Sequence, residues 1–122
     1  MVPQGRQREA VEEVYALLRQ AAVQRRPVAA IYEGRLRLLC PHVLGRKSGR
    51  LHGLFYQYGG SSRSGLPVKP EGVGEWRCLS VEKLSQVEFR SDLWHTEPRA
   101  LRQTCVDAVD LDVDDQPGGE PQ

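Results

Sequence analysis

Residues 6–25 show the apolar spacing of one helical face. Apolar side chains recur at intervals of three and four, with polar or charged residues between them, at Val11, Val14, Tyr15 and Leu18. Pro27 follows, and the residue before a proline avoids helical angles, so the helix is predicted to end there. Because one amphipathic helix cannot bury its own apolar face, we expect it to pack on a sheet.

The apolar period changes to two after residue 27. Residues 28–33 and 35–40 are predicted to form a hairpin that turns at Gly34. In the second strand, Arg35 and Arg37 alternate with apolar residues, so we expect both arginines on a solvated face. Residues 41–44 are predicted to leave this strand, and residues 45–49 to turn the chain.

Three more strands are predicted, at residues 51–58, 76–80 and 86–90, and the first of them places Leu54, Tyr56 and Tyr58 on one face. Residues 59–75 form a long glycine-rich loop, and residues 81–84 a tight turn or a single helical turn. The fold class is therefore mainly β with an N-terminal helix (α+β). Five short antiparallel strands behind one helix indicate a small barrel or a sharply bent sheet, which hides its edges by curling.

The pattern weakens near the C-terminus and divides the chain into three parts. We expect the helix in residues 1–27, the strand domain in residues 28–94, and an acidic, flexible tail in residues 95–122 that contributes little to stability. Within the tail, residues 105–113 alternate like an edge strand, but their acidity also fits disorder. Both alternatives stay open.

Charge is unevenly distributed along these 122 residues. All 17 lysines and arginines lie at or before Arg102, whereas six of the 16 acidic residues lie after it, so residues 1–104 carry an excess of seven positive charges. A basic body favours anionic partners such as nucleotides or nucleic acid, although scattered arginines also keep a small protein soluble.

The three cysteines, Cys40, Cys78 and Cys105, show no CxxC spacing. An odd number without paired spacing favours reduced thiols in a cytoplasm, and Cys40 and Cys78 fall at positions expected to be buried. The chain has no apolar run long enough to cross a membrane and no secretory signal at its start. These features predict a cytoplasmic protein with no membrane partner.

The start of the long loop combines conformational freedom with polar groups. Gly59 and Gly60 permit unusual backbone angles, and three hydroxyls and a guanidinium follow at Ser61, Ser62, Arg63 and Ser64. That inventory suits an anion or a polar ligand, and it equally fits an ordinary solvated hairpin loop.

No catalytic or metal-binding motif is complete. Residues 60–65 match GxxxxG, but Leu66 and Pro67 replace the lysine and hydroxyl residue of a phosphate-binding loop. Residues 80–83 match SxxK without its partner motifs. Zinc ligands would have to come from Cys40, His42, His52 and Cys78, whose spacing is poor. We therefore expect a non-enzymatic protein without a metal or another cofactor.

Several short strings resemble the WYL-like domain, the Sm-like or SH3-like barrel of many bacterial transcriptional regulators. The resemblance covers residues 28–93. Its most specific part is RCLSVEKL at residues 77–84, which is similar to the family's R-x-F-x-L-D-R-I ending. Residues 41–45 and 56–65 resemble the PHxLG and YQxGGxSxSG strings of short, stand-alone members. The naming tripeptide is replaced by Leu-His-Gly at residues 51–53.

The resemblance implies a five-stranded Sm-like or SH3-like barrel that senses an anionic ligand, either a nucleotide or nucleic acid. Arg77 and Lys83 would contact the anion, and His52 stands where the tripeptide has its tyrosine. Arg77 also shares a predicted face with two apolar residues, which suggests a groove, although a surface ion pair with Glu75, Glu82 or Glu88 explains it equally. The predicted ligand-binding residues are Arg77, Lys83, His52, Tyr58, Gly60, Ser61, Ser62, Arg63 and Ser64.

Only one helix precedes the predicted strands, and a recognition helix needs a supporting helix to read the major groove of DNA. The predicted function is therefore ligand sensing in regulation. The alternative is a protein-interaction subunit that uses the barrel edge or the acidic tail.

Overall fold

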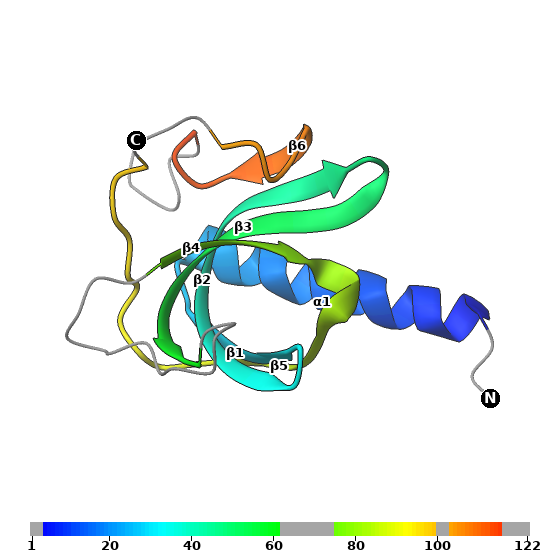
Figure 1. Ribbon diagram of the computed structural model, residues 1–122, viewed down its shortest axis with the longest axis horizontal. Helices are drawn as coiled ribbons and strands as arrows, with labels where there is room; N and C mark the ends of the chain where they lie inside the picture. Colours follow the sequence, from blue (N-terminus) through cyan, green and yellow to red (C-terminus); the bar gives the residue numbers. More distant parts are fainter. Residues whose placement is uncertain (1–3, 62–74, 100–102, 116–122) are drawn as a thin grey trace.

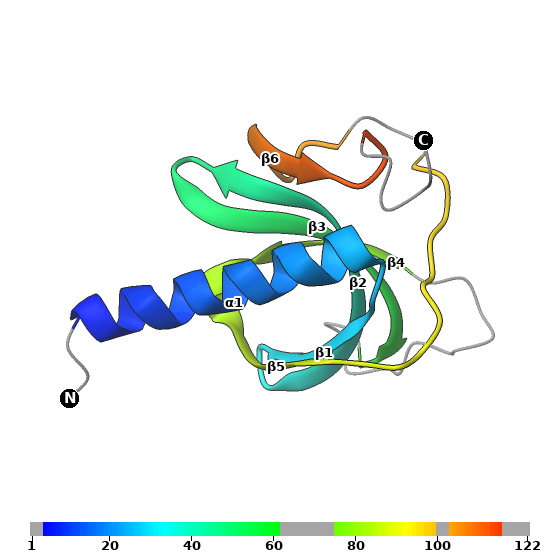
Figure 2. The ribbon, with the colours of Figure 1, turned by 180° about the vertical axis from the view of Figure 1, so that it is seen from behind.

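One helix lies across a curled antiparallel sheet (Figures 1 and 2). The computed structural model describes residues 4–61, 75–99 and 103–115. Helix α1 spans Gln4–Gln24, and the strands are β1 (Val28–Tyr32), β2 (Arg35–Lys47), β3 (Arg50–Gly60), β4 (Glu75–Ser80), β5 (Leu84–Phe89) and β6 (Ala108–Asp112). A 3₁₀ helix, η1 (Val81–Lys83), joins β4 to β5. The predicted class, mainly β with an N-terminal helix, is confirmed.

Helix α1 ends just before Pro27, as its sequence predicts. Arg25 adopts a left-handed backbone conformation (φ 54°), and the Arg26 N–H donates to the Ala21 carbonyl at 2.8 Å, which closes the last turn. The apolar face of the helix packs into the main core, where Leu18, Ala21 and Ala22 are fully buried. The N-terminal half of α1 extends beyond the sheet in both ribbon views (Figures 1 and 2).

The sheet has the strand order β4-β3-β2-β1-β5, and β6 pairs separately with β2. Strands β4 and β5 occupy opposite ends of this order, yet only the three residues of η1 connect them. The sheet must therefore curl to bring its ends together. Among the described strands no pairing joins β4 to β5, so the sheet is not closed.

Strand β2 continues well past Cys40, so the prediction that residues 41–44 leave the strand is wrong. The strand spans 13 residues and turns only at Ser48 and Gly49, which both have positive φ. Pro41 has no N–H, but the pairing of β2 with β3 shifts register between Pro41 and Val43. A bulge is the place where a central strand tolerates a proline.

The C-terminal segment, residues 103–115, adds an edge strand, the first of the two alternatives stated for residues 105–113. Strand β6 pairs with the second half of β2, from Val43 to Arg46. A Cβ at Gly45 would overlap the Ala108 carbonyl oxygen, so only glycine permits this close approach. Four apolar side chains of the segment are buried: Cys105, Val106, Leu111 and Val113. The expectation of a flexible tail is therefore wrong for residues 103–115.

Cys78 and Cys105 form a disulfide, which corrects the prediction of three reduced thiols. Cys78 is exposed on β4 and not buried as predicted, whereas Cys40 is a free, buried thiol, and burial raises its pKa to about 12. The pairing was hidden from the sequence because it depends on where the C-terminal segment packs.

The curled sheet is covered on both of its faces. The inner face packs against α1 and carries the main core, which includes Leu39, Leu44, Phe55 and Leu79. The outer face is covered by C-terminal residues and carries two smaller clusters: Val43, Leu54, Cys105 and Val106 in one, and Cys40, Tyr56 and Tyr58 in the other, with Trp76 packed against both. Within the described part of the chain, no helix is both long and apolar enough to cross a membrane.

Candidate functional site

Arg37 is the most unusual residue of the inner face. Its side chain is only 2% exposed, whereas Leu36 beside it is 48% exposed. The alternation along this strand was predicted, but the prediction that Arg37 faces solvent is wrong. The hairpin turn at Glu33 and Gly34, both with positive φ, sets the register that opposes Arg37 to the buried Ala30. The guanidinium lies over the Tyr32 ring, 5.4 Å from its centroid.

Gln57 links Arg37 to Arg77 across the inner face. This fully buried glutamine donates through Nε2 to the carbonyls of Gly59 at 2.9 Å and Ser61 at 2.8 Å. Its Oε1 is thereby turned toward the arginines, and it accepts from Arg37 Nη1 at 3.4 Å and Arg77 Nε at 3.3 Å. One amide oxygen therefore holds two guanidinium groups together.

Two of the three guanidinium nitrogens of Arg37 have no hydrogen-bond partner among the described residues. Among the described residues, neither Nε nor Nη2 makes a hydrogen bond, and Nη2 lies 3.6 Å from Glu33 Oε1. Burial lowers the pKa of Arg37, and the positive charge of Arg77 lowers it further. Leaving a buried charged donor unpaired costs about 1–3 kcal/mol or more. The geometry therefore holds hydrogen-bonding capacity that an anion would satisfy.

Arg77 stands on β4 at the mouth of the same site. Its side chain is about one-fifth exposed, and its Nη2 forms an ion pair with Glu75. Of the three surface carboxylates considered from the sequence, Glu75 is the one it contacts. A pocket of about 240 Å³ separates the hairpin turn from β4, and we call it the arginine pocket; its lining residues are Tyr32, Glu33, Arg37, Trp76, Arg77, Cys78 and Leu79.

Two loop residues predicted for the site support this pocket from behind. Gly60 has φ of 82°, and a Cβ there would overlap the Leu36 carbonyl oxygen. The Ser61 N–H donates to that same oxygen at 2.8 Å, and the Ser61 carbonyl receives the Gln57 amide. Both residues thus position Gln57. The predicted residues Ser62, Arg63 and Ser64 lie outside the described residues.

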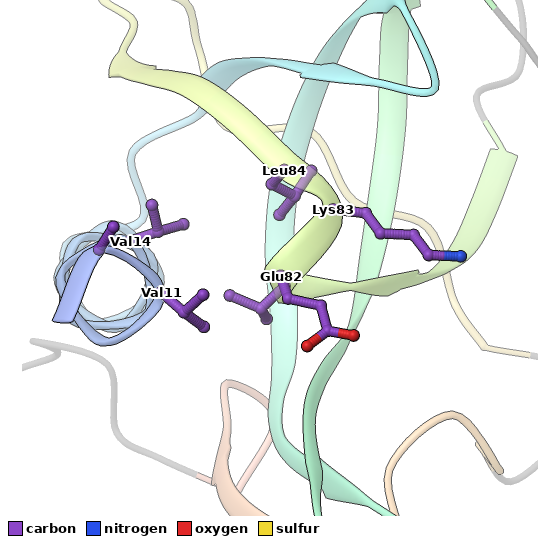
Figure 3. Close-up of a pocket in the computed structure, with 7 residues that line it drawn as sticks. Val11, Val14, Glu82, Lys83 and Leu84 are labelled. Carbon is purple, nitrogen blue, oxygen red and sulfur yellow. The ribbon is translucent and has the colours of Figure 1, made fainter. Parts of the chain in front are cut away.

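The other predicted residues lie away from the arginine pocket. Lys83 is exposed on η1 and lines a different groove of about 510 Å³ between α1 and η1, where its ammonium points away from the helix (Figure 3). His52 is half-buried on β3 opposite Ser80, with no hydrogen-bond partner for Nδ1 among the described residues. The buried Tyr58 lies on the outer face, where its hydroxyl donates to Asp92 at 2.7 Å and its ring stacks on His95.

A second buried polar residue, His42, lies on the outer face and is fully paired. Its Nδ1 lies 2.8 Å from the Cys40 carbonyl, so Nδ1 carries the proton, and Nε2 accepts from the Thr96 hydroxyl at 2.8 Å. The ring stacks on Trp94 at a centroid distance of 4.9 Å. Burial lowers the pKa of His42 to about 4. His42 therefore fastens residues 94–96 to β2 as a neutral group.

The candidate zinc ligands do not gather around a common point. Cys78 is in the disulfide and both His42 nitrogens are hydrogen-bonded to other groups. No three histidine, cysteine, aspartate or glutamate side chains in the described ranges are arranged to hold a metal ion.

Sequence reasoning missed Arg37, Gln57 and Glu33, which complete the site around Arg77. The one available signal was the alternation of residues 35–40, because a strand covered on both faces can place either set of its residues inward. Gln57 lies between two tyrosines predicted to share a face, so the alternation places Gln57 on the opposite face but does not show that this face is buried.

No family model matches the chain, and comparisons with curated proteins and with solved structures found no match.

Proposed function

We propose that this protein is a non-enzymatic, regulatory ligand-sensing module that binds an anionic ligand, a nucleotide or nucleic acid, in the arginine pocket. The observation that carries the proposal is the buried, incompletely paired guanidinium of Arg37, held beside Arg77 by one glutamine oxygen. An anion that reaches both arginines would supply charge-assisted hydrogen bonds to Nε and Nη2 of Arg37, which make none with the described residues.

We further infer that the curled sheet is a small Sm-like or SH3-like barrel of the WYL-like kind. The strand order supports this, because β5 follows η1 and pairs with β1 at the far end of the sheet from β4. Of the two family positions, Arg77 lines the arginine pocket and Lys83 the groove beside α1. A cytoplasmic location stays an expectation from the sequence. The Cys78–Cys105 disulfide does not support it, because disulfides are not typical of a reducing compartment.

The test is titration with a single-stranded oligonucleotide and with inorganic phosphate, followed by amide chemical shifts. Arg77→Ala should weaken binding roughly ten- to a hundredfold, because a charge-assisted contact is worth about 1.5–3 kcal/mol. Arg77→Lys should restore only part of the affinity, since the planar fork is lost. Each lost phosphate contact should also reduce the slope of log affinity against log salt by about 0.7–0.9.

Arg50→Ala is the matched control. Arg50 is exposed and pairs with Glu82, and neither residue lines the arginine pocket. The Arg50→Ala substitution changes the net charge of the protein by the same amount as Arg77→Ala. Equal weakening by the two variants would show general electrostatic attraction and no pocket, which contradicts the proposal.

A protein-interaction subunit is the second candidate function. The observation that favours it is the exposure of β6, where Val109 is 51% exposed and the strand pairs only with β2 among the described strands. An exposed strand edge is a template for pairing with another chain. Co-purification of one stoichiometric protein, lost in Val109→Pro, would favour this function over ligand sensing.

A further inference from the structure

Each arginine of the pocket already faces one carboxylate from the rim. Glu33, in the hairpin turn between β1 and β2, approaches Arg37, and Glu75 pairs with Arg77. Both carboxylate side chains are 49% exposed, whereas the two arginines are 2% and 22% exposed. The positive groups are thus fixed inside, and the negative groups lie at the surface where a ligand could replace them.

The charge of the pocket selects among phosphate ligands. Two guanidiniums with the rim carboxylates displaced present two positive charges. A phosphate monoester carries a charge of about −2 at neutral pH and three strong acceptor oxygens, whereas an internal phosphodiester carries a charge of −1. A volume of about 240 Å³ lies below the roughly 300–1,000 Å³ of whole small-molecule sites, so it suits a phosphate group with the rest of the ligand outside.

We propose that the arginine pocket binds a phosphate monoester in preference to a phosphodiester, and that Glu33 and Glu75 compete with it for the two arginines. This inference rests on the proposed function and narrows its ligand class. The monoester could belong to a free nucleotide or to the phosphorylated end of a nucleic acid, since both present the same group.

Methyl phosphate and dimethyl phosphate test the charge preference without any base. Binding to the full chain is followed by the shifts of the Arg77 amide and the Trp76 indole N–H. At pH 7.5 methyl phosphate should bind at least tenfold more tightly. At pH 5.5 its affinity should fall about fourfold, because the second pKa of a phosphate monoester is about 6 and only about a quarter stays dianionic. Dimethyl phosphate should be unaffected by pH.

The outcomes separate this inference from the proposed function. Equal affinity for the two esters would overturn the monoester preference and leave anion binding intact. No shift with either ester would overturn both. Among oligonucleotides, a 5′-phosphorylated ten-mer should bind more tightly than the same ten-mer without the phosphate. If the phosphorylated ten-mer binds more tightly than methyl phosphate, the natural ligand is the phosphorylated end of a nucleic acid. If the two bind equally, the natural ligand is a small phosphate ester. Both results support the preference for a monoester. Equal binding by the two ten-mers overturns it.

Glu33→Gln and Glu75→Gln test the competition. Each substitution keeps the shape of the side chain and removes its charge, so each should tighten methyl phosphate binding threefold to tenfold. Glu82→Gln is the control, because it makes the same change in net charge beside Arg50 and outside the pocket. If Glu33 and Glu75 only shape the pocket, methyl phosphate binding should be weaker or unchanged in the two variants. That result would overturn the proposal that these carboxylates compete with the ligand.

Discussion

Arg37 and His42 lie five residues apart on β2 and are almost equally buried, but they face opposite sides of the sheet and differ in how far they are hydrogen-bonded. His42 faces residues 94–96 and uses both ring nitrogens, whereas Arg37 faces the inner side and leaves Nε and Nη2 without hydrogen bonds among the described residues. A buried polar group that is fully paired holds the structure together. One that is incompletely paired lowers stability, and it is the basis of the ligand site that we propose.

Among the changes that test this comparison, removal of the C-terminal segment should lower the stability of the protein the most. A chain that ends at residue 102 loses the Cys78–Cys105 disulfide and three buried aliphatic side chains, Val106 of the outer face and Leu111 and Val113 of the main core. The disulfide contributes about 3 kcal/mol and each apolar side chain about 1.5–3 kcal/mol. We expect a loss of roughly 7 kcal/mol or more, which approaches the whole stability of a small domain.

Urea unfolding followed by circular dichroism measures this loss. Val109→Ala is the control: it changes an exposed side chain of β6 and should stay within about 0.5 kcal/mol. If the shortened chain keeps its stability within about 1 kcal/mol, the outer face needs no cover and the tail is as dispensable as the sequence indicated.

The pH dependence of stability should separate His42 from Arg37. The pKa of His42 is about 4 in the folded protein and about 6.5 when unfolded. Between these values the unfolded chain binds a proton that the folded protein does not, so the free energy of unfolding rises with pH. The contribution, about 3 kcal/mol, is complete above pH 6.5 and is lost as the pH falls toward 4. Arg37 stays charged throughout this range.

Chemical denaturation at several pH values tests this in the wild type and in His42→Gln, which should lack the slope between pH 6.5 and 4. Asp92 and Asp110 also have lowered pKa values, caused first by hydrogen bonds from Arg90 and Arg19, but they affect stability only below their usual pKa. An identical slope in both proteins would mean that another group is responsible.

Arg37→Met should have the smallest effect on stability. Methionine replaces the buried stem and removes an unpaired charge, so we expect a change within about 1 kcal/mol, with a gain as easily as a loss. The same substitution at His42 should cost about 2–3 kcal/mol, because it abandons two hydrogen bonds and the Trp94 ring. Thermal unfolding of the two variants gives this contrast, and a larger loss at position 37 would assign Arg37 to the structure.

Much of the fold followed from the sequence. The period of three to four in α1 and the period of two in β3 predicted the elements and the shared face of Leu54, Tyr56 and Tyr58. The site followed only in part, since Arg77 was found and Arg37 was assigned to solvent. Alternation shows which residues share a face but not which face is buried. The apolar Leu36 and Leu38 indicated that their own face was buried and that the face of Arg37 was solvated. The strand also continued through Pro41, because a bulge, which no local pattern reveals, absorbs the missing hydrogen bond.

Pro41 also divides one edge of β2 into two stretches with different pairing partners. On one edge of β2, β1 pairs up to Leu39 and β6 begins its pairing at Val43, and between them stands a residue with no amide hydrogen. We therefore expect transient opening to release β6 without breaking the β1 ladder. Such contiguous units set the rates at which amides exchange with solvent, so we expect two different exchange rates along β2. Arg37, the β2 residue of the arginine pocket, lies in the stretch paired with β1, so the pocket should stay assembled when β6 opens.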